Sequence, residues 1–156
     1  MASSAEAISV HSVNFVIGTT TKNTYDDWLL IPTARPVIVP PPLKSNYVDI
    51  PGANGDLDLT EAVTSVPVFG PREGNIEFYM KSTELSQPWF TMYSNVLTFL
   101  HGKSGKLILD DDPEWYYSGR FEIDTYESKE HWAVVSVKYH LQPYKTNVSN
   151  EQQKRL

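Results

Sequence analysis

The sequence contains no cysteine, which excludes disulfide bonds, thiolate zinc sites and cysteine nucleophiles and leaves the redox compartment open. It also lacks any run of about 18 apolar residues, the length that a membrane-spanning helix requires. The N-terminal segment MASSAEAISV has no basic region followed by an apolar block, so we expect no signal peptide. These absences lead us to expect no membrane partner.

Motifs that build catalytic or cofactor sites are absent as well. The four histidines lie far apart, without HxH or HExxH spacing, and the glycines are spaced as in turns. We expect His101 at the end of a helix, where an imidazolium complements the helix dipole. A hydrolase built on Asp49, Asp56 and Asp58 would need two carboxylates facing each other across a rigid cleft, and solvated turn residues are the favoured interpretation. We expect neither an enzyme nor a bound cofactor.

The densest acidic cluster is Asp110–Asp112, followed by Glu114. Calcium or magnesium is the alternative use of this cluster, because hard cations bind several carboxylate oxygens. Adjacent residues of an extended segment point in opposite directions, and the spacing is not that of an EF-hand. We therefore interpret the cluster as a strand end and predict no metal site. The aromatic run Trp115–Tyr117 is interpreted as packing, with sugar stacking as its alternative.

Basic residues are scarce: 13 Lys and Arg stand against 19 Asp and Glu, for a net charge of −6. The segment Lys145–Leu156 holds three positive charges and one negative, so residues 1–144 carry −8. Nucleic-acid binding depends on clustered basic groups. An acidic surface instead lets a polyanion pass without binding, although solubility alone also explains the charge.

Proline is plentiful in one stretch, Trp28–Glu61, which holds six of the chain's 11 prolines and many apolar residues. Proline excludes a helix or a central strand there, and a disordered linker would avoid so much apolar surface. The prediction is a stiff extended arm over residues 32–60, whose two legs span roughly 45 Å each if folded back on themselves. A loop packed on its own core is the alternative. The candidate contact residues for a neighbouring chain are Pro36, Val37, Val39, Pro41, Leu43, Tyr47, Ile50, Leu57 and Leu59.

The outer half of the arm has the pattern of a β-hairpin. Tyr47–Ile50 fits a short strand, and Asn54-Gly55 is a strong turn signal because both residues tolerate positive φ. In the returning strand, Leu57 and Leu59 alternate with aspartates, so one face is apolar and the other acidic. We expect Glu61–Val68 to continue as a strand.

The rest of the chain predicts a mainly antiparallel β fold of the α+β type with one helix. Alternation predicts strands, and the helical spacing of Trp89, Tyr93, Val96, Leu97 and Leu100 predicts a helix over about 86–101. Ser86 is the expected N-cap and Gly102 the expected end of that helix. The segment Lys145–Leu156 is polar and is expected to be disordered unless a neighbour orders it. The expected strands lie within 7–17, 75–81, 107–109, 116–126 and 131–141.

Five segments carry a resemblance to a known family. The sequence resembles the distal tail proteins of long-tailed, siphovirus-type phages that infect Gram-positive bacteria, over nearly the whole chain from about Trp28 to Tyr144. The matching segments are IPTARPVIVPPP (Ile31–Pro42), YVDIPGANGDLDLTEAV (Tyr47–Val63), FGPREG (Phe69–Gly74), LHGKSGKLILDDDPEWYYSGR (Leu100–Arg120) and QPY (Gln142–Tyr144).

The resemblance implies a tail-tube-like antiparallel β-sandwich, residues 1–144, with a helix beside two sheets and six subunits closed into a ring. It implies a structural virion protein at the distal end of the tail, made in the host cytoplasm, that surrounds the DNA path without binding DNA specifically. The implied partners are further copies of the chain, the tail-tube protein, the tail-tip or baseplate hub protein and the tape-measure protein.

Two alternatives stay open at this point. A major tail-tube or tail-completion subunit would share the fold and the charge, and a host-wall carbohydrate-binding module would need a concave aromatic patch. We also expect Arg35 and Arg72 to pair with carboxylates at subunit contacts, because few basic groups offset so many acids.

Overall fold

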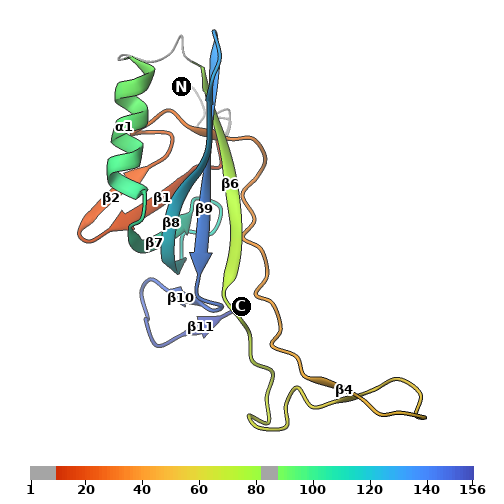
Figure 1. Ribbon diagram of the computed structural model, residues 1–156. Coiled ribbons are helices and arrows are strands. Elements are labelled where there is room, and N and C mark those ends of the chain that lie inside the picture. Colours follow the sequence, from red (N-terminus) through yellow and green to blue (C-terminus); the bar gives the residue numbers. More distant parts are fainter. Residues whose placement is uncertain (1–9, 82–87) are drawn as a thin grey trace, which may run out of the picture.

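The computed structural model describes residues 10–81 and 88–156, which form eleven strands and one helix (Figure 1). Strand pairing in these ranges is antiparallel throughout, which is consistent with a β-sandwich and confirms the predicted class, mainly β with one helix. The elements are β1 (Val13–Ile17), β2 (Thr20–Asn23), β3 (Ile31–Pro32), β4 (Tyr47–Asp49), β5 (Asp56–Asp58), β6 (Arg72–Lys81), α1 (Trp89–Leu100), β7 (Ser104–Leu109), β8 (Trp115–Ser128), β9 (Trp132–Leu141), β10 (Lys145–Asn147) and β11 (Lys154–Arg155).

Nine strands form one sheet in the order β2-β1-β7-β8-β9-β6-β3, with β10 and β11 attached beside β8. The longest pairing joins β6 to β9, from Arg72 opposite Leu141 to Lys81 opposite Trp132. The alternation predicted for these strands is confirmed, because their inward residues form the core. The buried residues are Ile76, Phe78 and Met80 on β6 and Ala133, Val135, Val137, Tyr139 and Leu141 on β9.

The helix α1 lies along one side of the sheet (Figure 1). It begins after Pro88, whose missing N–H costs nothing at a helix start, and Gly102 follows its end with φ of 75°. Met92, Val96 and Leu100 are the buried residues of the helix, of which the predicted stripe missed Met92. The predicted N-cap Ser86 lies outside the described residues.

Two expected features of the strands are wrong. Glu61–Val68 forms turns rather than a strand, and Val63 is 95% exposed, because no second strand lies beside this segment. The segment Lys145–Leu156 is ordered: β10 pairs with β8, placing Thr146 opposite Tyr116, and β11 pairs with β10. The neighbour that orders this polar segment is therefore a strand of the same chain.

The arm is longer than predicted and spans residues 33–71, between β3 and β6. Figure 1 shows its first part running beside β6 and the rest projecting away from the sheet to a distant β4–β5 hairpin. Its second leg returns directly into β6, close to the C-terminal β10–β11 pair (Figure 1). The arm thus joins a fixed root on the body to a tip that lies apart from it.

Candidate assembly site: the projecting arm and its root

The root of the arm, Pro36–Val39, packs against the body of its own chain. Pro36 and Ile38 are buried, and Val39 packs against the core. Both backbone polar groups of Val39 have buried partners on the sheet: its N–H donates to the Tyr139 hydroxyl at 3.1 Å, and its carbonyl accepts from Arg72 Nη1 at 3.1 Å. The root is therefore held by specific hydrogen bonds as well as by apolar contact.

Arg72 joins the arm root to the C-terminal part of the chain. Arg72 is 5% exposed, and its guanidinium donates through Nε to the Pro143 carbonyl at 3.0 Å and lies 5.3 Å from the centre of the Tyr117 ring. One side chain thus binds the carbonyls of Val39 and Pro143, which lie 104 residues apart in sequence. The expectation that Arg72 pairs with a carboxylate at a subunit contact is wrong, because this cation is enclosed by its own subunit.

Tyr139 completes the root and leaves no room for a larger residue opposite it. A Cβ atom at Gly74 would lie 2.6 Å from the Tyr139 hydroxyl oxygen, so glycine is required at that position of β6. Burial raises the pKa of Tyr139, against the opposing effects of the Val39 N–H hydrogen bond and the Arg72 charge. The neutral phenol is therefore the form that the fold stabilises.

We expect Tyr139→Phe to lower the free energy of unfolding by about 1–2 kcal/mol at neutral pH, because the Val39 N–H loses its acceptor. The pKa of Tyr139 is higher in the folded state than the ordinary tyrosine value of 10.0. The neutral phenol therefore contributes fully to the free energy of unfolding below pH 10.0, and this contribution is lost as the pH rises through the folded-state pKa. Urea unfolding at a series of pH values tests both points. The wild type should lose stability above about pH 10 more steeply than the variant, and parallel curves would contradict this assignment.

Beyond the root, the two legs of the arm form a short two-stranded neck, Pro42–Lys44 beside Val68–Gly70. The Gly70 N–H donates to the Pro42 carbonyl at 2.7 Å, and the Lys44 N–H donates to the Val68 carbonyl at 2.8 Å. Leu43 and Phe69 form an antiparallel bridge between these bonds. The neck therefore directs the tip away from the body as a paired ribbon.

The tip is the β4–β5 hairpin, and its prediction from the sequence is confirmed. Tyr47 lies opposite Asp58, Val48 opposite Leu57 and Asp49 opposite Asp56. Gly52 and Gly55, with φ of 83° and 72°, make the turn between the strands. Because opposed residues share a face, one face carries Val48 and Leu57, and the other carries Tyr47 with the three aspartates.

The acidic face of the tip is held in a charged form at its inner end. Asp58 accepts a hydrogen bond from the Thr60 N–H at 2.9 Å. The Thr60 side chain, and next its backbone N–H, lower the pKa of Asp58. These contacts fix one carboxylate at the point where the tip joins the second leg.

The arm concentrates the exposed apolar surface of the described residues. Eight of their fourteen exposed large hydrophobic side chains lie between positions 37 and 66. Such a concentration is typical of an interaction surface rather than of a free monomer surface. The eight are Val37, Leu43, Tyr47, Val48, Ile50, Leu57, Val63 and Val66.

The structure divides the nine candidate contact residues by burial. Pro36 is buried, and Val39, Pro41 and Leu59 are half-buried, so these four contribute wholly or partly to the subunit itself. Of these four, Pro36 and Val39 lie in the root, where the arm packs on its own body. The remaining candidates project with exposed side chains: Val37, Leu43, Tyr47, Ile50 and Leu57.

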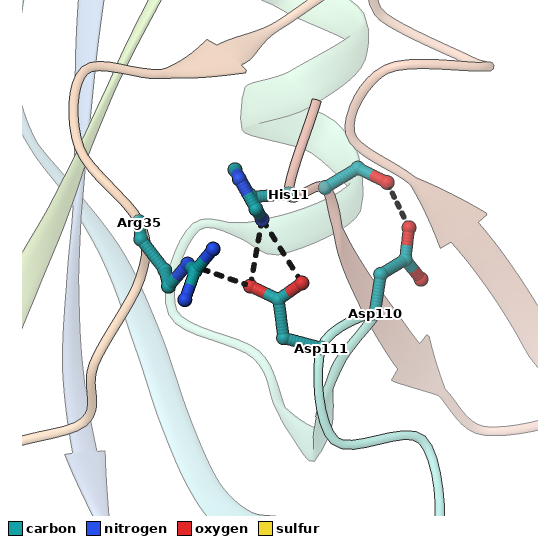
Figure 2. A network of polar contacts seen from close by, with 5 residues as sticks. His11, Arg35, Asp110 and Asp111 are labelled. Carbon is teal, nitrogen blue, oxygen red and sulfur yellow. Dashed lines mark hydrogen bonds and ion pairs between the residues drawn. The ribbon is translucent and has the colours of Figure 1, made fainter. Parts of the chain in front are cut away.

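The acidic cluster at the end of β7 has partners within the chain. Asp110 accepts hydrogen bonds from the Ser12 hydroxyl and, at 2.7 Å, from the Asn14 side chain. Figure 2 shows Asp111 between His11, at 2.9 Å, and the arm residue Arg35, at 3.8 Å.

Asp112 completes this cluster and lies 2.7 Å from Lys145 Nζ on β10. The three aspartates thus connect β7 to separate parts of the fold. In residues 10–81 and 88–156, no group of three or more metal-binding side chains comes together.

Burial and geometry also bear on the aromatic run and on His101. Trp115, Tyr116 and Tyr117 are all buried, so this run offers no stacking platform for a sugar. His101 Nδ1 accepts a hydrogen bond from the Ile123 N–H at 3.1 Å, which requires a neutral ring rather than the expected imidazolium. Within the described part of the chain, no helix is long and apolar enough to cross a membrane.

Comparison with known proteins gives a likeness to a solved structure. No protein-family model matches the sequence, and no curated protein matches it. The crystal structure of the Dit protein (gp 19.1) of phage SPP1, described as a paradigm of the hub adsorption apparatus in Gram-positive infecting phages, superposes over 86% of this chain with a TM-score of 0.61. This chain has the Dit fold. The resemblance to distal tail proteins is thereby confirmed at the level of the fold.

The likeness has a defined extent. The two sequences are 16% identical, so fold rather than residue identity relates them, and this chain spans about half of the Dit chain, 52% of its length.

Proposed function

We propose that this chain is a structural subunit of a phage tail, forming a distal ring that links the tail tube to the tail-tip or baseplate hub. The fold likeness to SPP1 Dit over 86% of the chain carries the proposal. The subunits close into a ring of six around the DNA path. The tail-tube protein contacts one side of the ring, and the hub protein contacts the other, with the tape-measure protein as a further partner.

The exposed arm supports assembly as the mode of action. Its tip presents apolar side chains that its own body does not cover, and burial of such surface stabilises association. A head-to-tail contact made by one arm per subunit closes into a ring when the rotation between neighbours closes. An obligate interface of this kind buries upwards of roughly 2,000 Å².

The charge of the chain supports a path for DNA rather than a binding site for it. With a net charge of −6, the subunit repels phosphates on average. A ring around a DNA path must let DNA pass without binding it. We therefore expect only weak binding of the protein to duplex DNA, with little dependence of that binding on salt.

The mass of the purified protein in solution tests the ring. Light scattering coupled to gel filtration should give a mass near six times the 17.7 kDa of one chain. A single-chain mass at every concentration measured would reject the ring. A closed oligomer of another number would leave the ring in place and correct the copy number.

The position of the protein in the virion distinguishes the distal ring from a tail-tube subunit. Antibody labelling followed by electron microscopy should mark one level at the distal end of the tail. Label along the whole tail would instead assign the chain to the tube, and no label on tails would reject a tail component.

A further inference from the structure

A groove beside the C-terminal strands combines apolar and basic surface. It has a volume of about 220 Å³ and lies where β8, the end of β9, β10 and β11 meet. Its lining includes the apolar Pro143 and Tyr144 and the cationic Lys154. Val148, on the loop between β10 and β11, adds a further exposed apolar side chain nearby in the chain. We call these elements, Pro143–Arg155, the C-terminal hairpin.

The C-terminal hairpin is a positive region of a negative chain. Residues 145–156 hold Lys145, Lys154 and Arg155 against Glu151 alone. Lys145 is engaged inside the subunit with Asp112, whereas Lys154 and Arg155 are exposed. Of these two exposed cations, Lys154 lines the groove together with Tyr144, and Arg155 follows it on β11.

The arm has the opposite charge and the matching apolar content. Residues 45–68 contain Asp49, Asp56, Asp58 and Glu61 and no lysine or arginine. The tip has an apolar face and an acidic face, so a tip entering the groove edge-on contacts an apolar and a basic lining at once. Charge and hydrophobicity therefore match between two distant surfaces of the same chain.

The two surfaces cannot meet within one subunit. The C-terminal hairpin lies at the root of the arm, where Arg72 binds the Pro143 carbonyl and Phe69 contacts Tyr144 at 6.2 Å between ring centres. The paired neck directs the tip away from this region (Figure 1). The ten residue steps from Pro42 to Gly52 reach roughly 33 Å, enough to cross a neighbouring subunit of about the same width.

We propose that the β4–β5 tip of one copy docks in the groove of the C-terminal hairpin on a second copy. This inference rests on the proposed ring and names the surface that receives the arm. Every copy carries one tip and one groove, so the contact is head-to-tail and each groove in a closed ring is filled. On each copy, the root of its own arm lies beside the groove that receives the tip of another copy, and Arg72 hydrogen-bonds to both regions.

Charge reversal on both sides tests this contact. Asp49→Lys with Asp56→Lys, and separately Lys154→Glu with Arg155→Glu, should each weaken self-association at least about tenfold, because like charges then meet. The chain that carries all four changes should regain association, since the charges are exchanged rather than removed. The measurement is mass against concentration by light scattering, at low and high salt.

Matched controls separate the contact from general charge effects. Asp26→Lys with Asp124→Lys changes the net charge by the same amount as the reversal of Asp49 and Asp56, but at exposed positions outside the arm. This control should leave the mass of the oligomer unchanged. Arg155 also lies 5.3 Å from the centre of the Trp115 ring, so Lys154→Glu alone provides a variant that keeps that packing. Circular dichroism confirms that each variant is folded.

The outcomes are distinguishable from those that test the ring. A wild-type ring that survives both reversals overturns the docking and leaves the proposed function intact, whereas a wild-type monomer rejects both. Loss of binding to a purified tube or hub protein, with the ring retained, would assign the groove to that partner and overturn the proposal. Recovery in the four-fold variant supports the tip-to-groove contact.

Discussion

Replacing Lys44–Val68 with Asn-Gly is expected to turn the ring into folded single subunits. Leu43 and Phe69 already form an antiparallel bridge, so a two-residue type I′ turn can close the shortened neck without moving the body. The replacement removes the tip, which carries six of the eight exposed apolar side chains of the arm. Loss of this surface removes the main contact proposed between copies, while the core stays complete.

The measurements for this variant are mass and stability together. Light scattering should give the mass of one subunit at concentrations where the wild type is a ring. Urea unfolding of the subunit should change little, because most of the removed residues are exposed, none is fully buried, and their strand pairing is confined to the arm. A ring-sized mass in the shortened chain would contradict the role given to the arm.

A point-substitution version uses the cross-strand pair of the tip. Val48→Ser with Leu57→Ser removes the apolar face of the hairpin and should weaken association. Phe90→Ser removes a 75% exposed aromatic side chain from α1 and should not. Equal effects of the two changes would indicate that general surface hydrophobicity, rather than the tip, drives association.

The parts of the fold that the sequence predicts are those with a strong local pattern. Alternation in β6 and β9 places their buried faces correctly, because period-two hydrophobicity and sheet burial have the same geometry. Asn54-Gly55 locates the turn of the tip correctly, because the preference of this residue pair for a tight turn is a local property of the sequence. The apolar residues of the proline-rich stretch likewise indicate a surface left uncovered by the chain's own core.

The parts that the sequence does not predict depend on partners distant in the chain. β10 and β11 are short and polar, and only pairing with β8 makes them strands. The alternating valines of Glu61–Val68 have a strand pattern but no strand beside them, so the segment turns. Asp110 and Asp111 bind residues about 100 positions earlier, which no local pattern indicates.

Arg72 is the clearest case of a role hidden from the sequence. A charged residue in the turn sequence GPREG is expected at the surface. The structure buries it at the start of β6, where its guanidinium donates to the carbonyls of Val39 and Pro143. A signal was present in the flanking pattern, because Ile76, Phe78 and Met80 share its inward phase on β6.

Arg72→Met is expected to lower the free energy of unfolding by about 2–4 kcal/mol, because it leaves two partly buried carbonyls without donors. Arg72→Lys should recover only part of this loss, since one ammonium does not reproduce the planar fork that reaches two carbonyls. Urea unfolding of the monomeric, arm-shortened chain measures both values without a contribution from assembly.

Arg120→Met is the matched control, because Arg120 also donates to a carbonyl, that of Gly102 at 2.7 Å, but from an exposed position. Its effect should stay within about 1 kcal/mol. In the full-length chain, Arg72→Met should also speed hydrogen exchange at the Val39 amide and weaken association, because a loosened root loses conformational freedom on docking. Unchanged exchange at Val39 together with wild-type stability would show that apolar packing of Pro36 and Ile38 alone holds the arm.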